Sequence, residues 1–260
     1  MTRVAASLIL MLVVFLPSCS SISDARRWQD ARQMQTAAGT YRAMRLSYLL
    51  HVPRGSAPEN GWPLVLFLHG AGERGSDVWQ VATQGPPARL DIDQRLRQSI
   101  VVSPQCPKEW WWDSVTLKQL LDEVLASQNV DRSRIYVTGL SMGGYGTWHL
   151  MTSYPNLFAA GVPICGGGDP NRYKTRGAPD WIPVTFDESR LSLLRTVPVW
   201  AFHGAQDKAV PIAESQRLVT RLKAIGSPVR FTVYPNAGHD SWTATYANPA
   251  VWDWLFSKHR

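Results

Sequence analysis

The sequence feature that most constrains the fold is a series of short apolar or alternating runs, each ending in a turn of glycine, proline or polar residues. Such runs are typical of strands, and stretches with helical periodicity lie between them. Strands that alternate with helices form a mostly parallel sheet with helices on both faces, so the sequence predicts an α/β fold. Polar alternation in the last run predicts an edge strand. The expected strands cover residues 41–52, 63–68, 100–102, 135–137, 160–164, 197–202 and 229–234, and the expected helices cover 116–128, 142–153, 213–225 and 249–258.

The size and composition fit one domain of this class. The chain has 260 residues and a mass of 29.1 kDa. Apolar residues make up 45% and charged residues 18%, which argues against disorder, collagen and coiled coil. The net charge is +7, but the longest basic run has only two residues, Arg26 and Arg27. The sequence therefore predicts no nucleic-acid partner, although weak attraction to anionic surfaces stays open.

The N-terminus has the pattern of an export signal rather than of a folded element. Arg3 supplies a positive end, and Leu8–Leu16 is an unbroken run of nine apolar residues. A helix of this length is too short to span a bilayer. We therefore interpret residues 1–18 as a signal peptide.

The end of this signal predicts how the protein is held after export. Residues 16–19, Leu-Pro-Ser-Cys, resemble the bacterial lipobox, in which the cysteine becomes the lipidated first residue of the mature protein. Cys19 is then the lipidation site, and the protein is a periplasmic or cell-envelope lipoprotein. Plain secretion is the alternative. Residues 19–38 are polar and predict a tether or short helix, and residues 39–260 form the folded domain.

Two further cysteines, Cys106 and Cys165, enter an oxidising space if the protein is exported. Their distance in sequence leaves open whether they form a disulfide. The chain contains no CxxC pair, no HExxH motif and no histidine pair on one helix face. We therefore expect no bound metal.

The first candidate catalytic residue is Ser141. The segment Gly-Leu-Ser-Met-Gly at 139–143 matches the G-x-S-x-G nucleophile elbow. The motif requires a strand before the serine and a helix after it, and residues 135–137 and 145–151 supply both patterns. A sharp turn of this kind leaves no room for side chains beside the serine, which explains the glycines. The alternative is a capping serine at a glycine-rich helix start.

A serine nucleophile needs a base, and an acid that orients the base. His239 follows the last strand on a glycine-containing loop, and Asp207 follows the strand over residues 197–202. The chain order Ser, Asp, His is that of the α/β-hydrolases. His69 and His203 precede glycines at strand ends, where a structural role is more common. The other histidines are His51, His149 and His259, and the competing acids are Asp180, Asp187 and Asp240.

Attack on an ester carbonyl places negative charge on its oxygen, which two preset N–H donors stabilise. The backbone N–H of Met142, directly after the nucleophile, is one predicted donor. The loop His-Gly-Ala-Gly at 69–72 follows a strand and predicts the N–H of Ala71 as the other. A simple tight turn is the alternative for this loop.

Five segments of the chain resemble a known family: LVLFLHGAGERGSD, RIYVTGLSMGGYGTW, VPICGGGD, VWAFHGAQDKAVP and PNAGHDSW. They are similar to bacterial α/β-hydrolases labelled predicted peptidases or phospholipase/carboxylesterase-like proteins, which are related to polyhydroxybutyrate depolymerases, feruloyl esterases and dienelactone hydrolases. The resemblance covers roughly residues 40–258. It implies the α/β-hydrolase fold, a triad of Ser141, Asp207 and His239, and an oxyanion hole at Met142 and Ala71. One departure is the long segment Gly166–Arg195, which forms either a small lid or a surface loop.

Four tryptophans are candidates for substrate binding. Trp110, Trp111 and Trp112 follow the strand over 100–102, and Trp242 lies three residues after His239. Aromatic faces pack against sugar rings or aromatic acids. A hydroxycinnamoyl or acetyl group on a plant polysaccharide therefore suits the site. Because consecutive residues point in different directions, we expect at least one residue of the triple to lie in the core.

The predicted function is hydrolysis of carboxylic esters through an acyl-enzyme, with no cofactor. The expected partner is a small ester or an acylated polysaccharide, and the only expected membrane contact is the lipid on Cys19. A peptidase with the same triad and a non-catalytic glycan-binding surface protein are the alternatives.

Overall fold

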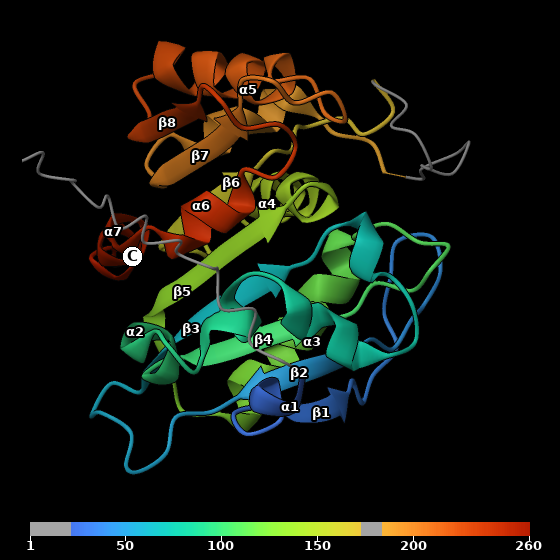
Figure 1. Ribbon diagram of the computed structural model, residues 1–260, viewed down its shortest axis with the longest axis vertical. Helices are drawn as coiled ribbons and strands as arrows, with labels where there is room; N and C mark the ends of the chain where they lie inside the picture. The colour runs from blue at the N-terminus through green and yellow to red at the C-terminus, as the bar shows by residue number, and fades with distance from the viewer. Residues whose placement is uncertain (1–21, 173–183) are drawn as a thin grey trace, which may run out of the picture.

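The computed structural model describes residues 22–172 and 184–260. The signal peptide, Cys19 and the middle of the 166–195 segment, including Lys174, Arg176 and Trp181, lie outside the described residues. Within them, one eight-stranded sheet runs through the molecule in the order β1-β2-β4-β3-β5-β6-β7-β8 (Figure 1). The strands are β1 Asp30–Gln33, β2 Ser47–His51, β3 Trp62–Leu68, β4 Ile100–Pro104, β5 Val130–Leu140, β6 Ala160–Ile164, β7 Val199–Gly204 and β8 Val229–Tyr234.

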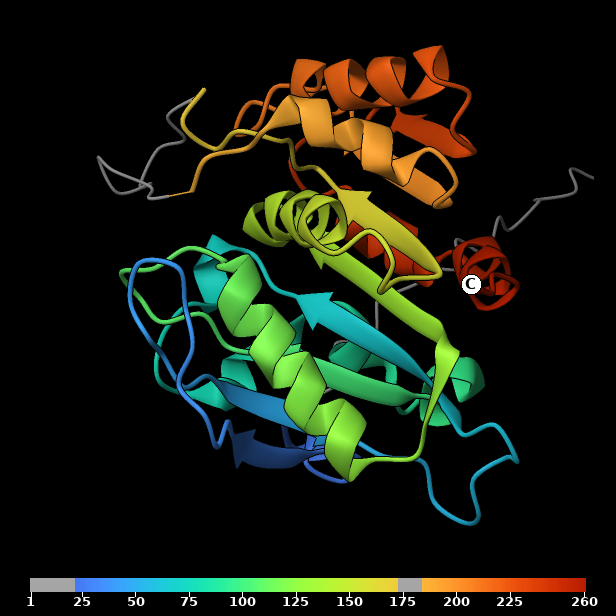
Figure 2. The same ribbon diagram turned by 180° about the vertical axis from the view of Figure 1, so that it is seen from behind.

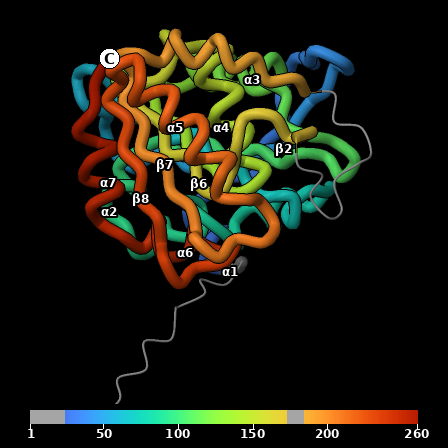
Figure 3. The backbone as a smooth tube through the Cα atoms, turned by 90° about the horizontal axis from the view of Figure 1, so that it is seen from above, coloured from blue at the N-terminus to red at the C-terminus, as the bar shows by residue number. Residues whose placement is uncertain are grey.

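The six strands from β4 to β8 are parallel, and β2 and β1 add antiparallel to the β4 edge. This is the mostly parallel sheet of the α/β-hydrolase fold, as predicted. Figure 3 shows β7 between β6 and β8, and β8 forms the far edge as its polar alternation predicted. Because parallel strands end at one edge of the sheet, the loops after β3, β5, β7 and β8 meet there.

Helices cover both faces of the sheet (Figures 1 and 2). Along β3, Leu64, Leu66 and Leu68 pack with α3, α4 and α5, whereas Val65 and Phe67 pack with α2, α6 and α7. This alternation is the two-residue period of a strand buried on both sides. The helices are α1 Ile22–Ala25, α2 Gln94–Arg97, α3 Ser114–Ser127, α4 Met142–Ser153, α5 Ala213–Ala224, α6 Trp242–Ala247 and α7 Pro249–Phe256, and the 3₁₀ turns are η1 Ala71–Glu73, η2 Val78–Thr83, η3 Pro86–Arg89 and η4 Glu188–Leu194. Among the described helices, none is both long and apolar enough to cross a membrane.

Residues 19–38 were expected to form a tether or short helix, and within the described part of this range the structure has the short helix α1 and, in addition, a strand. Asp30–Gln33 form β1, which pairs antiparallel with β2 from Asp30 opposite Leu50 to Gln33 opposite Ser47. All four residues of β1 are exposed. Backbone pairing at the sheet edge therefore holds this strand in place. The sequence has no apolar pattern here that would predict a strand. The folded domain begins before residue 39.

The other differences concern the ends of elements and two helices. The expected strand over 41–52 is shortened to β2, and β5 begins at Val130, before the expected residue 135. Helix α2 and helix α6, the latter directly after the loop that holds His239, have no predicted counterpart. Cys106 and Cys165 are both buried and both free thiols, so no disulfide links them.

Candidate active site

Ser141 lies at a sharp turn between β5 and α4. Its backbone has φ 53° and ψ −116°, a combination that residues other than glycine rarely adopt. Such a conformation costs on the order of 1–3 kcal/mol and persists only where the surroundings enforce it. The Ser141 N–H donates to Ile164 O at 3.0 Å, which fixes the turn to the end of β6. The turn thus presents the hydroxyl at the start of a helix.

The glycines of the elbow are required by close backbone contacts. A Cβ on Gly143 would lie 1.8 Å from Leu68 O, and one on Gly139 would lie 2.3 Å from Gly143 O. Helix α4 can therefore cross the ends of β3 and β5 only because these two positions carry no side chain. This packing places the first turn of α4 against the loop after β3.

The structure brings Ser141, His239 and Asp207 into one chain of hydrogen bonds. His239 Nε2 lies 2.8 Å from Ser141 Oγ, and His239 Nδ1 lies 2.8 Å from Asp207 Oδ2. A carboxylate only accepts, so Nδ1 carries the imidazole proton and Nε2 accepts from the serine hydroxyl. The rings of Trp242 and His239 pack edge to face, with their centroids 5.4 Å apart. The arrangement can move a proton away from Ser141 Oγ while Asp207 stabilises the imidazolium.

The side chain of Asp207 is fully buried and has four N–H donors within 3.2 Å of its oxygens. Its Oδ1 accepts from the N–H groups of Ala209 and Val210 at 2.8 and 2.9 Å. Its Oδ2 accepts from His239 and lies 3.2 Å from Nε2 of a second histidine, His203. Burial alone would raise the pKa of Asp207, but the donors outweigh burial and hold this pKa below its ordinary value. The acid therefore stays a carboxylate.

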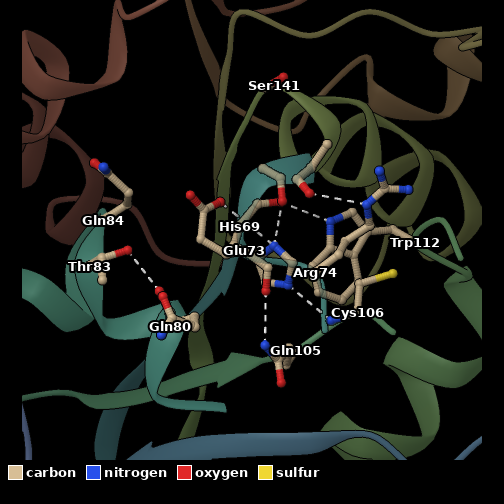
Figure 4. A network of polar contacts seen from close by, with 12 residues as sticks. His69, Glu73, Arg74, Gln80, Thr83, Gln84, Gln105, Cys106, Trp112 and Ser141 are labelled. Carbon is tan, nitrogen blue, oxygen red and sulfur yellow. Dashed lines mark hydrogen bonds and ion pairs between the residues drawn. The ribbon is translucent and has the colours of Figure 1, made fainter. Parts of the chain in front are cut away.

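The loop after β3 is held by its own histidine, as Figure 4 shows. His69 is fully buried; its Nε2 accepts from the Cys106 N–H at 2.9 Å, so its Nδ1 carries the proton and donates to Gly70 O at 2.6 Å. Burial lowers the pKa of His69 to about 4, so the ring is neutral. In a trans peptide the C=O and the following N–H point in opposite directions. Fixing Gly70 O on the inside therefore turns the Ala71 N–H outward.

Ala71 and Met142 both line a cavity of about 510 Å³ that contains Ser141 and His239. Met142 is the first residue of α4, where backbone N–H groups have no partner within the helix. The two predicted oxyanion donors thus belong to the same cavity as the hydroxyl. The cavity is lined by Gly70, Ala71, Gly72, Glu73, Arg74, Trp111, Leu140, Ser141, Met142, Tyr145, Ala209, Val210, His239 and Trp242.

The four candidate tryptophans separate into two groups. Trp111 and Trp242 line the cavity, as the sequence predicted. Trp112 does not: it is buried in the core and donates from Nε1 to His69 O at 3.1 Å. Trp110 also lies outside this cavity, and its ring packs under the guanidinium of Arg42. Trp110 and Trp112 do not line this cavity because consecutive side chains point in different directions, and substrate contact stays a prediction for all four tryptophans.

Glu73 and Arg74 line the cavity, and the sequence reasoning did not select them. Arg74 Nε donates to Ala71 O at 3.1 Å, and burial raises the pKa of Glu73. Gln105 Nε2 donates to Glu73 O at 2.9 Å and so ties the loop to the end of β4 (Figure 4). Both residues directly follow the loop 69–72. Their position in the sequence could therefore have predicted that they lie beside the cavity.

One group of metal-ligating atoms lies close together among the described residues: those of Cys165, Asp207 and His239, within 4.8 Å of one another. Burial raises the pKa of the Cys165 thiol well above its usual range, so it is a poor ligand here. Asp207 and His239 already bond to each other. Their geometry fits proton transfer better than metal binding.

No described residue of the 166–195 segment is among the residues that line the cavity. Phe186 packs its ring against His149 at 4.9 Å, and His149 Nε2 bonds to Gly168 O at 2.7 Å. His149 is buried, which lowers its pKa to about 4. Residues 173–183 lie outside the described residues, so the choice between lid and surface loop stays a hypothesis.

Comparison with known proteins identifies relatives. The model of the prolyl oligopeptidase family matches residues 117–257. Poly(3-hydroxyalkanoate) depolymerase C of Paucimonas lemoignei is 32% identical over 47% of this chain and 31% of its own length. The bifunctional acetylxylan esterase/xylanase XynS20E of Neocallimastix patriciarum is 26% identical over 61% of this chain and 21% of its own. The chain thus spans a third or less of these curated relatives.

A solved structure also matches. The crystal structure of a thermostable esterase superposes with a TM-score of 0.75 and 32% identity, covering 90% of this chain and 64% of the esterase.

The packing of the elbow predicts unequal effects of two glycine substitutions. Gly143→Ala places a methyl group against Leu68 O, whereas a Cβ on Gly72 has no atom within 4 Å. We expect Gly143→Ala to lower the free energy of unfolding by more than about 3 kcal/mol and Gly72→Ala by less than about 1 kcal/mol, measured by urea denaturation. Equal stability of the two variants would contradict the crowding described here.

Proposed function

The chain belongs to the prolyl oligopeptidase family, and we propose that it hydrolyses carboxylic esters through an acyl-enzyme formed on Ser141. The observation that carries the proposal is the hydrogen-bonded chain from Ser141 Oγ through His239 to the buried Asp207. A lone serine hydroxyl is a weak nucleophile, and this chain supplies the base that activates it. The esterase and depolymerase names of the relatives favour an ester substrate.

In the first step, His239 Nε2 takes the proton from Ser141 Oγ while Oγ bonds to the ester carbonyl carbon. The N–H groups of Met142 and Ala71 stabilise the negative charge on the carbonyl oxygen. His239 then gives its proton to the leaving alcohol oxygen as the bond between this oxygen and the acyl carbon breaks. An acyl group on Ser141 and a free alcohol result.

In the second step, His239 takes a proton from water, whose oxygen bonds to the acyl carbon. The same two N–H groups hold the second oxyanion. The bond from the acyl carbon to Ser141 Oγ breaks, and Oγ recovers its proton from His239. The carboxylic acid leaves, and the chain's own residues complete the cycle.

The cavity favours an acyl or alcohol group with a flat or ring-shaped face. Trp111 and Trp242 line it, and aromatic rings stack on sugar rings and on hydroxycinnamoyl groups. A volume of about 510 Å³ suits a small acyl group together with part of its alcohol. We therefore propose acetyl or feruloyl esters of a polysaccharide as the substrate class.

A second candidate is a peptidase that uses the same three residues, and the family match itself favours it. Ester and amide hydrolysis share the acyl-enzyme, and they differ in the leaving group that His239 must protonate. A non-catalytic glycan-binding protein has no need of the three-residue chain, so that chain argues against it.

Export follows from the N-terminal pattern. Arg3, the apolar run Leu8–Leu16 and the lipobox-like segment that ends in Cys19 support a signal peptide and a lipid anchor. We propose a lipoprotein of the cell envelope.

The nucleophile is tested by Ser141→Ala. We expect kcat/KM for p-nitrophenyl acetate to fall by at least about 10³-fold, because the remaining oxyanion donors act without a nucleophile. Wild-type protein should react with a fluorophosphonate probe at Ser141, and the variant should keep its melting temperature. Turnover that survives the substitution would exclude this nucleophile. A wild-type enzyme that cleaves peptide amides faster than esters would select the peptidase.

The aromatic lining is tested by Trp242→Ala, with Trp110→Ala as the control outside the cavity. We expect Trp242→Ala to raise KM for methyl ferulate relative to that for p-nitrophenyl acetate by about 3- to 10-fold, because stacking on the larger ring is lost. Trp110→Ala should leave this ratio unchanged. An equal effect of the two variants would refute a substrate contact at Trp242.

The anchor is tested by expressing Cys19→Ser in a bacterial host with radioactive palmitate. We expect wild-type protein and a Ser20→Ala control to carry label and sediment with membranes, whereas Cys19→Ser carries none. Unlabelled wild-type protein in the culture medium would establish plain secretion instead.

A further inference from the structure

The buried His203 does not belong to the Ser141–His239–Asp207 chain, yet it contacts that chain directly. It lies near the end of β7, and its side chain is fully buried. Its Nε2 lies 3.0 Å from Val210 O and 3.2 Å from Asp207 Oδ2. Both neighbours only accept hydrogen bonds, so Nε2 must carry a proton. The one hydrogen on Nε2 is shared between these two acceptors, so Asp207 Oδ2 faces the N–H groups of two imidazoles.

The other ring nitrogen fixes the orientation of His203. Its Nδ1 lies 2.8 Å from Ser215 Oγ and, because Nε2 carries the proton of the neutral ring, accepts the hydroxyl hydrogen there; the same Oγ lies 2.9 Å from Gly166 O. Ser215 lies on α5, and Gly166 follows β6. Gly166 packs so closely against α4 that a Cβ there would lie 2.5 Å from the Gly144 carbonyl carbon. The ring is thus locked between α5 and the elements that hold the nucleophile.

We propose that His203 is a positioning residue: it donates from Nε2 to Asp207 Oδ2 and thereby sets the pH at which His239 is free to accept the Ser141 proton. The proposal rests on the proposed function of Ser141, Asp207 and His239. The second donor takes up part of the negative charge that would otherwise stabilise protonated His239. Without this donor, more of the negative charge of Asp207 faces His239 and holds a proton on it.

Other titratable groups face this pair from the surrounding elements. Glu214 on α5 is buried, and burial raises its pKa, while Arg217 donates to it at 2.8 Å. Tyr145 on α4 and Cys165 after β6 are buried, and burial raises the pKa of each. Asp240 follows His239 in the chain. A test of His203 must leave all of these groups in place.

The first experiment uses unaltered protein labelled with ¹⁵N-histidine. We expect the Nε2 of His203 to have the chemical shift of a protonated nitrogen coupled to a hydrogen across the pH range of activity. An unprotonated Nε2 would overturn the proposal. This measurement needs no catalysis, so it tests His203 even if Ser141 is not the nucleophile.

The second experiment compares His203→Gln with His203→Asn. The glutamine side chain places its amide nitrogen near the position of the imidazole Nε2 and so keeps a donor to Asp207. The shorter asparagine side chain places its amide nitrogen near the position of Nδ1, beside Ser215, and leaves no donor to Asp207. We expect His203→Asn to move the acidic limb of the kcat/KM profile to higher pH by about 0.5 unit or more. The limb of His203→Gln should stay within about 0.2 unit of the unaltered enzyme.

Ser215→Ala is the control, because it removes the outer contact of the ring and leaves the donor to Asp207. We expect it to leave the acidic limb in place. An unmoved limb in folded His203→Asn, or equal shifts in the Asn and Gln variants, would overturn the proposal. Fluorophosphonate labelling of unaltered protein separates these outcomes from failure of the proposed function, since that failure removes the labelling itself. If the Asn variant does not fold, the ¹⁵N measurement decides.

Discussion

The site depends on keeping one buried carboxylate charged. The side chain of Asp207 has no exposed surface, and an unpaired charge in such a place costs several kcal/mol. Its four donors come from the loop after β7, from β7 itself and from the loop after β8. These segments meet because β7 and β8 pair in register from Val199 opposite Val229 to Gly204 opposite Tyr234. The acid and the base are therefore held together by the sheet.

The loops after β7 and β8, which carry Asp207 and His239, also contact each other directly. The Gln206 N–H donates to Ala237 O at 2.9 Å, which ties one loop to the other. A Cβ on Gly204 would lie 2.1 Å from Gly238 O. A side chain at this position would push the base away from its acid. Glycine is thus as necessary between acid and base as it is beside the nucleophile.

Much of this arrangement was predictable because strand ends are marked in the sequence. The buried strands read as apolar runs, and the residues directly after them, Ser141, Asp207 and Ala71, lie together as expected for a parallel sheet. β1 was missed because its four exposed residues are held by backbone pairing alone. The sequence did not separate Trp111, which lines the cavity, from Trp110 and Trp112, which do not, because a run of three tryptophans gives no direction for each ring. His203 was classed as structural because its contact with Asp207 depends on how the loop after β7 folds back.

The early strand β1 limits how far this domain can stand from a membrane. It is paired to the sheet from Asp30 onward, only 11 residues after Cys19. Even a fully extended chain of this length spans roughly 40 Å, less than the size of many polysaccharide assemblies. A lipid on Cys19 would therefore hold the cavity within about one protein diameter of the bilayer. Anchored in this way, the cavity would reach only material close to the membrane, such as soluble oligomers, and not distant insoluble fibres.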